Sequence, residues 1–137
     1  MQDWVETGYQ TYSKRLPAHV NIELKEIPAG GRQSRAEDAM LLKHAAAADL
    51  IIALDEAGQA WSSEQLAEQM TGWMQNSPHV ALLIGGPDGL SGRCKERAQS
   101  LWSLSNLTLP HGLVRVVLAE QLYRAWTILQ GHPYHRA

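Results

Sequence analysis

The C-terminal end of this chain of 137 residues concentrates side chains that could do chemistry. The sequence ends in "HPYHRA", which places His132, Tyr134, His135 and Arg136 within five positions. An imidazole, a phenol and a guanidinium can together abstract a proton and hold a phosphate. A frayed chain end with no chemical role is the ordinary alternative for terminal residues. These residue types therefore make the tail a candidate active-site segment.

Metal binding and nucleophilic catalysis are both poorly supported by the sequence. His132 and His135 have an H-x-x-H spacing, but no Cys, Asp or Glu stands near them to complete a ligand set. The single Cys94 lies in a charged segment and is expected to be structural, and no Ser-His-Asp spacing is legible. We therefore expect no metal site. One cysteine also excludes a disulfide within the chain and fits a reducing cytoplasm.

Two turns that follow apolar segments have a composition suited to ligand binding. The segment 82–90, "LLIGGPDGL", contains Gly85 and Gly86, which let the backbone approach a ligand closely. The segment 107–115, "LTLPHGLVR", leads into a helix whose N-terminus favours anionic groups. Neither turn is a phosphate loop or a dinucleotide fingerprint. Taken alone, each of them is better explained as a plain connection between two elements.

Charge is distributed unevenly along the chain, whose net charge is −2. Residues 1–91 hold six basic and twelve acidic residues, a net charge of −6. Residues 92–137 hold six basic and two acidic residues, a net charge of +4. Such an asymmetry allows an anion-binding face on an acidic protein, with chance clustering of solvated charges as the alternative.

Apolar periodicity predicts helices and strands that alternate along the chain. Strands are expected at three places and a short strand or loop at a fourth: 19–27, 49–55, 79–86 and 105–110. Helices are expected over five segments: 3–15, 36–48, 62–75, 92–102 and 111–131. Ser62 and Gln65 match a capping box, and Gly131 is the expected stop of the last helix. Continuous apolar strands between helices indicate one α/β domain, residues 1–137, with a mainly parallel sheet.

Composition places the chain among soluble globular proteins of the cytoplasm. Apolar residues make up 45% and charged residues 19% of the sequence. No apolar run approaches the roughly 20 residues that a membrane helix needs, and the N-terminus is not a signal peptide. The tryptophans are expected in the core or at an interface, with base stacking as the lesser option: Trp4, Trp61, Trp73, Trp102 and Trp126.

Four segments taken together resemble the pseudouridine N3-methyltransferases of 23S rRNA, a family of the SPOUT superfamily. They are "IPAGGR", "LLIGGPDGLS", "WSLSNLTLPHGLVRVVLAEQLYRAW" and "HPYHR". The match follows the order of the chain and is densest from residue 80 onward. The resemblance implies a mainly parallel sheet flanked by helices with a C-terminal trefoil knot, a rare exception to unknotted chains. It also implies S-adenosylmethionine as cofactor and a homodimer whose active site draws on both subunits.

The resemblance assigns roles to particular residues. Three loops would surround the cofactor through Leu54, Gly85, Gly86, Leu107, Thr108, Leu109, Pro110, His111 and Gly112. Candidates for contact with the RNA backbone are the basic residues of the C-terminal half: Arg93, Lys95, Arg97, Arg115 and Arg124. Arg115 or Arg124 can equally pair with Glu120.

The implied reaction is methyl transfer from a sulfonium to N3 of a pseudouridine, whose N3–H must first lose its proton. His135 or Tyr134 would take that proton, with His135 slightly favoured because its ordinary pKa lies nearest neutrality. Arg136 would anchor a phosphate or stabilise the imidate that forms. A small domain without an appended RNA-binding module is expected to recognise a preformed ribosomal surface by shape. Free rRNA, the large subunit and the assembled ribosome all stay open as substrates.

Two departures from the family pattern accompany the resemblance. Family members begin with a strand before the "DWV" helix, and none precedes it here. The stretch from "GGRQSR" to "AEDAM" is also several residues shorter than in the family. The alternatives are another SPOUT specificity, such as ribose 2′-O or tRNA base methylation, and a noncatalytic ribosome-binding module. A generic α/β metabolite-binding domain is the weakest, because it leaves the basic C-terminal half unexplained.

Overall fold

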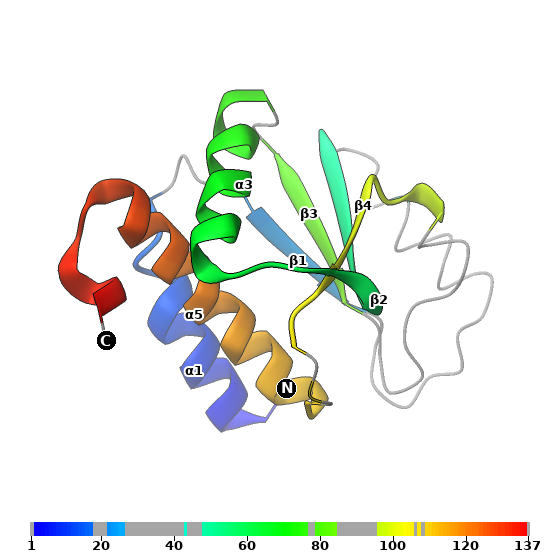
Figure 1. The fold of residues 1–137 in the computed structure, drawn as a ribbon. Coiled ribbons are helices and arrows are strands. Elements are labelled where there is room, and N and C mark those ends of the chain that lie inside the picture. Colours follow the sequence, from blue (N-terminus) through cyan, green and yellow to red (C-terminus); the bar gives the residue numbers. More distant parts are fainter. Residues whose placement is uncertain are drawn as a thin grey trace.

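Four parallel strands form the sheet of this protein in a computed structural model that describes residues 2–17, 22–26, 43, 48–76, 79–84, 96–105, 107 and 109–136. The strand order is β1-β3-β2-β4, and every pairing is parallel (Figure 1). The strands are β1 (Ile22–Glu26), β2 (Leu50–Ala60), β3 (Val80–Ile84) and β4 (Ser100–Ser103). The predicted parallel α/β architecture is thereby confirmed.

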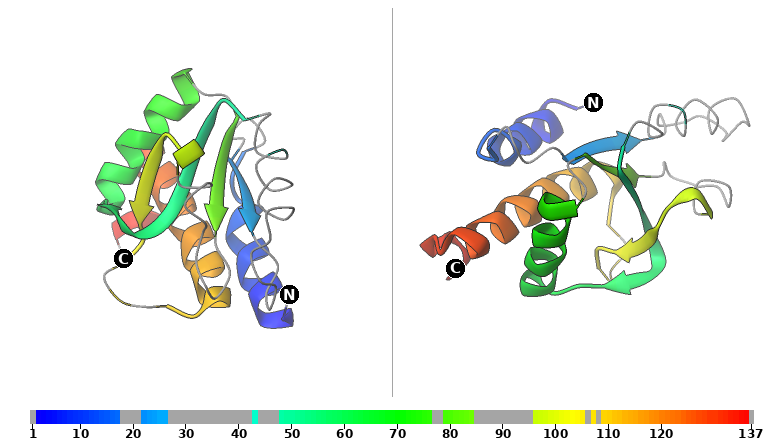
Figure 2. Two further views of the ribbon diagram at one scale, coloured as in Figure 1. Left: turned by 90° about the vertical axis from the view of Figure 1, so that its right-hand side faces the viewer. Right: turned by 90° about the horizontal axis from the view of Figure 1, so that it is seen from above.

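Three long helices lie on the same side of this sheet (Figure 2). They are α1 (Asp3–Ser13), α3 (Ser63–Asn76) and α5 (His111–Gln130), and the short 3-10 helix η1 (Pro133–Arg136) ends the described chain. The last long helix, α5, contacts both α1 and α3. Within the described residues no helix is both long and apolar enough to span a membrane.

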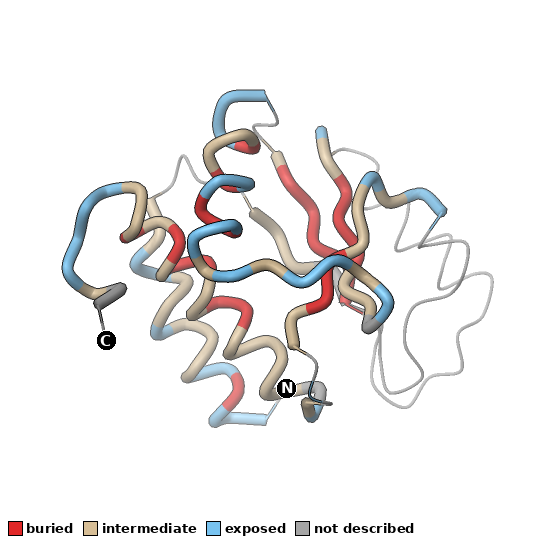
Figure 3. Tube along the Cα trace, in the orientation of Figure 1, coloured by how far each residue is buried: buried red, intermediate tan, exposed pale blue. Residues whose placement is uncertain are grey.

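The core explains why β3 and the first half of β2, residues 50–54, are continuously apolar. Every residue of β3 is at most 3% exposed, because both faces of the strand are covered. One face packs toward α3 and α5 through Ile52, Val80, Leu82 and Ile84, together with Leu66, Met70, Leu118 and Leu122 from the helices. The other face forms a smaller cluster of Ile51, Ala53, Ala81 and Leu83. Figure 3 shows these two strands as the buried centre of the molecule.

Two helix ends follow the local signals of the sequence. The Ser62 N–H donates to Gln65 Oε1 at 2.8 Å, and the Gln65 N–H donates to Ser62 Oγ at 3.1 Å, so the predicted capping box is confirmed. Such a cap contributes about 1 kcal/mol to helix stability. Gly131 takes a left-handed conformation (φ 70°) directly after α5 and donates its N–H to the Ile128 carbonyl, as a C-terminal stop should.

The helix predicted over residues 92–102 was wrong, whereas the loop option for residues 105–110 agrees with the described residues. Residues 100–103 form β4 instead of ending a helix, and only Glu96 and Arg97 of the predicted helix are helical within the described part. The described residues of 105–110 are not a strand. Pairing with β2 and burial of Trp102, which is 2% exposed, outweigh the helical charge pattern of the preceding segment. The predicted helix over 36–48 lies outside the described residues, apart from Lys43 and Ala48.

Candidate functional site

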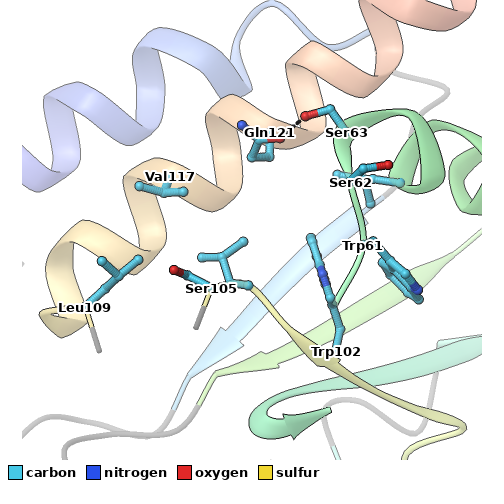
Figure 4. A pocket seen from close by; sticks show the side chains of 10 residues that line it. Trp61, Ser62, Ser63, Trp102, Ser105, Leu109, Val117 and Gln121 are labelled. Carbon is cyan, nitrogen blue, oxygen red and sulfur yellow. Dashed lines mark hydrogen bonds between the residues drawn. The ribbon is translucent and has the colours of Figure 1, made fainter. Parts of the chain in front are cut away.

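A cavity of about 360 Å³ lies between the start of α3, the segment after β4 and the middle of α5 (Figure 4). One wall is aromatic: Trp61 and Trp102 stack with ring centroids 5.0 Å apart and planes 27° apart. The remaining lining comes from Ser62, Ser63, Leu66, Leu104, Ser105, Leu109, Val117 and Gln121. The cavity therefore borders the carboxyl end of a parallel strand, where open α/β sheets bind their ligands.

Polar groups in this cavity are few and fixed by the fold. Ser63 Oγ donates to Gln121 Oε1 at 2.7 Å and so ties the first residue of α3 to α5. Ser105 Oγ accepts the Leu107 N–H at 2.9 Å, which shapes the segment after β4. The Trp102 Nε1 is buried and has no hydrogen-bond partner among the described residues. A buried donor without an acceptor is costly, so this indole N–H is suited to a polar atom of a ligand.

Only part of the predicted cofactor set meets this cavity. Leu109 lines it, and Leu107 lies 75% exposed beside it. Pro110 is the N-cap of α5, not its first helical residue, and its carbonyl accepts the Val114 N–H at 3.0 Å. Leu54 pairs with Trp102 in the sheet and packs against the core. His111 begins α5, whereas Gly85, Gly86 and Thr108 lie outside the described residues.

Gly112 has a packing reason for lacking a side chain. A Cβ at this position would lie 2.7 Å from Val5 Cγ2 on α1, closer than carbon atoms approach. A Cβ on Gly8 of α1 would likewise lie 3.0 Å from Val116 Cγ2 of α5. Small residues at these two points let the helices approach each other. The glycine that was predicted to face the cofactor therefore also serves the contact between α1 and α5.

The tail folds back against α5 and α1 of its own chain. The Tyr134 N–H donates to His132 Nδ1 at 3.1 Å. Its ring meets Tyr123 edge-on, with centroids 4.7 Å apart and planes at 67°, and the Arg124 guanidinium lies 5.1 Å from the ring centroid. Burial raises the pKa of Tyr134, and Glu120 and Tyr12 raise it further, against the opposing effect of Arg124. Tyr134 is therefore neutral at neutral pH, which makes it a hydrogen-bond donor and not a base.

The tail and the predicted cofactor segment are well separated within one chain. Tyr134 lies beside Tyr123, which is twelve residues and therefore about 18 Å of helix away from His111. The two halves of the predicted site thus stand at different levels of α5. A single chain does not bring the tail onto residues 107–112.

The predicted RNA-binding cations have different surroundings. Arg97 is exposed near the start of β4. Arg115 is half-buried with its guanidinium 5.2 Å from the Tyr9 ring centroid. Arg124 is the residue that pairs with Glu120, at 2.7 Å, and this bond raises the pKa of Arg124. Arg93 and Lys95 lie outside the described residues.

The sequence reasoning missed the aromatic wall. It assigned Trp61 and Trp102 to core or interface, and Trp102 is indeed buried, but together they also line the cavity. Trp73 is buried as predicted, whereas Trp4 is 53% exposed. The motifs "WSS" and "WSLS" place a serine beside each wall tryptophan, and this was the available signal. Within the described ranges no three His, Cys, Asp or Glu side chains gather as a metal site would require.

Comparison with known proteins identifies the family. A family described as "Predicted SPOUT methyltransferase" matches residues 1–135. The chain belongs to the SPOUT methyltransferase family. A relative from Hahella chejuensis is 53% identical over 144 residues, covering 99% of this chain and 92% of the relative. One from Cupriavidus metallidurans is 50% identical over 148 residues, covering 100% and 93%. Both are named "Ribosomal RNA large subunit methyltransferase H", so the resemblance is confirmed.

Solved structures support the SPOUT fold alone, because their sequences are distant. A probable methylase family protein from Haemophilus influenzae Rd KW20 matches with a TM-score of 0.54 at 10% identity, covering 82% of this chain and 68% of that one. TrmJ from Z. mobilis ZM4 matches with a TM-score of 0.55 at 11% identity, covering 90% and 65%. These agreements confirm the predicted SPOUT architecture of the sheet and helices.

Proposed function

We propose that this SPOUT protein transfers a methyl group from S-adenosylmethionine to N3 of a pseudouridine in 23S rRNA. The main support is sequence identity of 53% and 50%, over nearly the whole chain, to two relatives named as large-subunit rRNA methyltransferases. The tail "HPYHR" supports methylation of a nucleobase nitrogen, since its residue types suit proton removal from a weakly acidic N–H.

The cavity fits a nucleoside-bearing cofactor. Its volume of about 360 Å³ is within the range of small-molecule sites, and its aromatic wall suits a flat heterocycle. Trp102 Nε1 would donate to a polar atom of the nucleoside, and Leu109 and Ser105 would border it from the segment after β4. S-adenosylmethionine supplies an electrophilic methyl group when bound. Gly85, Gly86 and Thr108, together with the trefoil knot, remain predictions from the family resemblance.

Proton removal is assigned to His135. The surroundings of Tyr134 raise its pKa, so at neutral pH its hydroxyl donates to the imidate oxygen that develops on the base. His135 follows Tyr134 in η1, and its ordinary pKa lets the neutral imidazole accept the N3 proton. Arg136, the next residue, would hold a phosphate of the substrate RNA.

A homodimer completes the site in this proposal. Since about 18 Å of α5 separates the tail from the cofactor segment, a second copy must supply one of them. Several apolar side chains of α5 are only half-buried in the single chain, including Leu113, Ile128 and Leu129. Packing these side chains against a twofold mate would bury them and bring each tail toward the partner's cavity. We expect the substrate to be rRNA within a ribosomal particle, recognised by shape in the cytoplasm.

The test is transfer of a labelled methyl group to particles that lack the modification. The purified protein would be incubated with labelled S-adenosylmethionine and, in parallel, assembled ribosomes, large subunits and naked 23S rRNA. We expect label on a single pseudouridine of a ribosomal particle and little on naked rRNA. Label on a ribose or on tRNA would contradict the proposal and indicate a SPOUT methyltransferase with another target. A folded protein that binds S-adenosylmethionine but labels no RNA would favour a noncatalytic ribosome-binding role.

A further inference from the structure

Four side chains from three elements gather around the base of the tail. They are Tyr12 and Arg15 near the end of α1, Tyr123 of α5 and Tyr134 of η1, here called the tail cluster. Tyr123 is at the centre of the cluster, and only 7% of its surface is exposed. Its ring centroid lies 6.3 Å from that of Tyr12 and 4.7 Å from that of Tyr134. The tail thus rests on α1, more than a hundred residues earlier in the chain, through one buried ring.

The geometry of these contacts restricts the Tyr134 ring. The edge-on arrangement with Tyr123, at 67°, is a preferred geometry for aromatic pairs and fixes the plane of the Tyr134 ring. Tyr12 is tilted by 38° against the same central ring. Burial, Glu120 and the nearby Tyr12 all raise the pKa of Tyr134, so the environment of the Tyr134 hydroxyl depends on α1 as well as on α5.

Arg15 closes the cluster from the solvent side. Its guanidinium lies 5.5 Å from the Tyr123 ring centroid and 5.8 Å from that of Tyr12, both within the range of cation–π contacts. The planar guanidinium of an arginine can lie against both tyrosine rings and fix their relative orientation. The ammonium of a lysine, on a flexible stem, does this less well. Lys14, the neighbouring cation, is exposed on the same helix end and has no ring contact of this kind among the described residues.

We propose that Tyr12 of α1 and Arg15, which lies two residues beyond the end of that helix, are positioning residues that act through Tyr123 and Tyr134 to hold the tail in its reactive orientation. This role rests on the proposed function of the tail. Misplacing a reacting group by about 1 Å can cost up to roughly 100-fold in rate. Losing either positioning residue should therefore lower kcat and leave the affinities for cofactor and ribosomal particle nearly intact.

The kinetic test uses matched substitutions on one helix end. Tyr12→Leu and Arg15→Met should lower kcat by about 10-fold or more, with KM for the ribosomal particle and Kd for S-adenosylmethionine changed less than about twofold. Tyr12→Phe keeps the ring, and Arg15→Lys keeps the charge, so each should restore part of the loss. Lys14→Met is the control, because it removes an equal charge one residue away without touching the tail cluster.

Two results would overturn the proposal. If Arg15→Met and Lys14→Met raise KM equally and leave kcat unchanged, Arg15 contacts the RNA backbone instead. If Tyr12→Leu keeps the kcat of the unaltered protein, α1 does not position the tail.

A readout without activity separates this inference from the proposed function. The Tyr134 N–H is bonded to His132 Nδ1 in an exposed turn that has little stability of its own once the Tyr134 ring leaves Tyr123, so hydrogen exchange at this amide reports on the docked tail. Exchange should speed up by about 10-fold in Tyr12→Leu and Arg15→Met and stay unchanged in Lys14→Met. Unchanged exchange in all three variants would exclude the docking role even if the protein methylated no RNA at all.

Discussion

At the scale of single residues, our proposal divides the acid–base work of the tail between two neighbours, Tyr134 and His135. Tyr134 is held by Tyr123 and Arg124 in surroundings whose burial raises its pKa above the ordinary value of 10.0. A base must be deprotonated to act, so a tyrosine base here would require a pH above 10. An imidazole with an ordinary pKa near 6.5 is half deprotonated already below neutrality. The proton acceptor in our proposal is therefore His135.

The pH dependence of the reaction tests this division. We expect kcat to rise with pH through about 6.5, because the neutral form of His135 accepts the proton. His135→Asn should lower kcat by about 100-fold or more and abolish this rise, whereas Tyr134→Phe should keep the rise at a reduced rate. The profile would be measured with saturating cofactor. A rise near pH 10 that Tyr134→Phe removes would make tyrosine the base.

At the scale of elements, the junction between β2 and β4 places the aromatic wall. Trp102 pairs with Leu54 and then, after a shift in register, with Gln59. The backbone of β2 returns to β4 at Gly58, where a Cβ would lie 2.6 Å from the Leu101 carbonyl carbon and the Trp102 nitrogen. No ordinary side chain fits at this distance, because the obstacle is backbone and cannot turn aside. Gly58 thus lets β2 hold Trp102 at the cavity.

Substitution of this glycine should affect stability strongly. Gly58→Ala is expected to lower the free energy of unfolding by ~1–3 kcal/mol, because the strands must move apart. Gly72→Ala is the matched control: a Cβ there meets nothing within 4 Å, and alanine in the interior of α3 should stabilise by ~0.5–1 kcal/mol. Urea denaturation at one fixed protein concentration measures both. If both substitutions changed the free energy of unfolding by the same amount, the β2–β4 junction would have to relax around the methyl group added at Gly58.

At the scale of the whole molecule, α5 decides how the active site is assembled. It carries Val117 and Gln121 on the cavity and Tyr123 under the tail, so both halves of the proposed site belong to one helix. Gln121 and Tyr123 are two residues apart and therefore point to nearly opposite faces of the helix, which keeps the cavity and the tail on different sides of α5 in one chain. The proposed dimer solves this by combining the tail of one copy with the cavity of the other.

Mixing two inactive variants tests the shared site. His135→Asn removes the proposed base, and Ser105→Tyr fills the cavity. Random exchange between the two makes half of the dimers heterodimers, each with one intact site, so activity should return to about a quarter of the unaltered level. Circular dichroism of each variant controls for folding, and the double variant mixed with itself controls for residual activity. No recovery after demonstrated exchange would place tail and cavity in one chain.

Local sequence signals predicted a large part of this protein. The capping box at Ser62, the stop at Gly131, the buried strand β3 and the buried first half of β2 each depend on residues within a few positions of one another. The family motifs also identified the SPOUT methyltransferase family. Short-range periodicity and capping are physical properties of the segment itself, so the sequence suffices to predict them.

Only the tertiary structure decided which distant residues meet. The segment 100–103 became a strand because β2 lies beside it, and the sequence pattern around it had indicated a helix. Trp61 and Trp102 form one wall although 41 positions separate them, and Tyr12 lies under a tail at the other end of the chain. The family resemblance assigned Gly112 to the cofactor, but the contact that requires its small size is with Val5 on α1. Such contacts depend on the packing of the whole fold, and no local pattern carries that information.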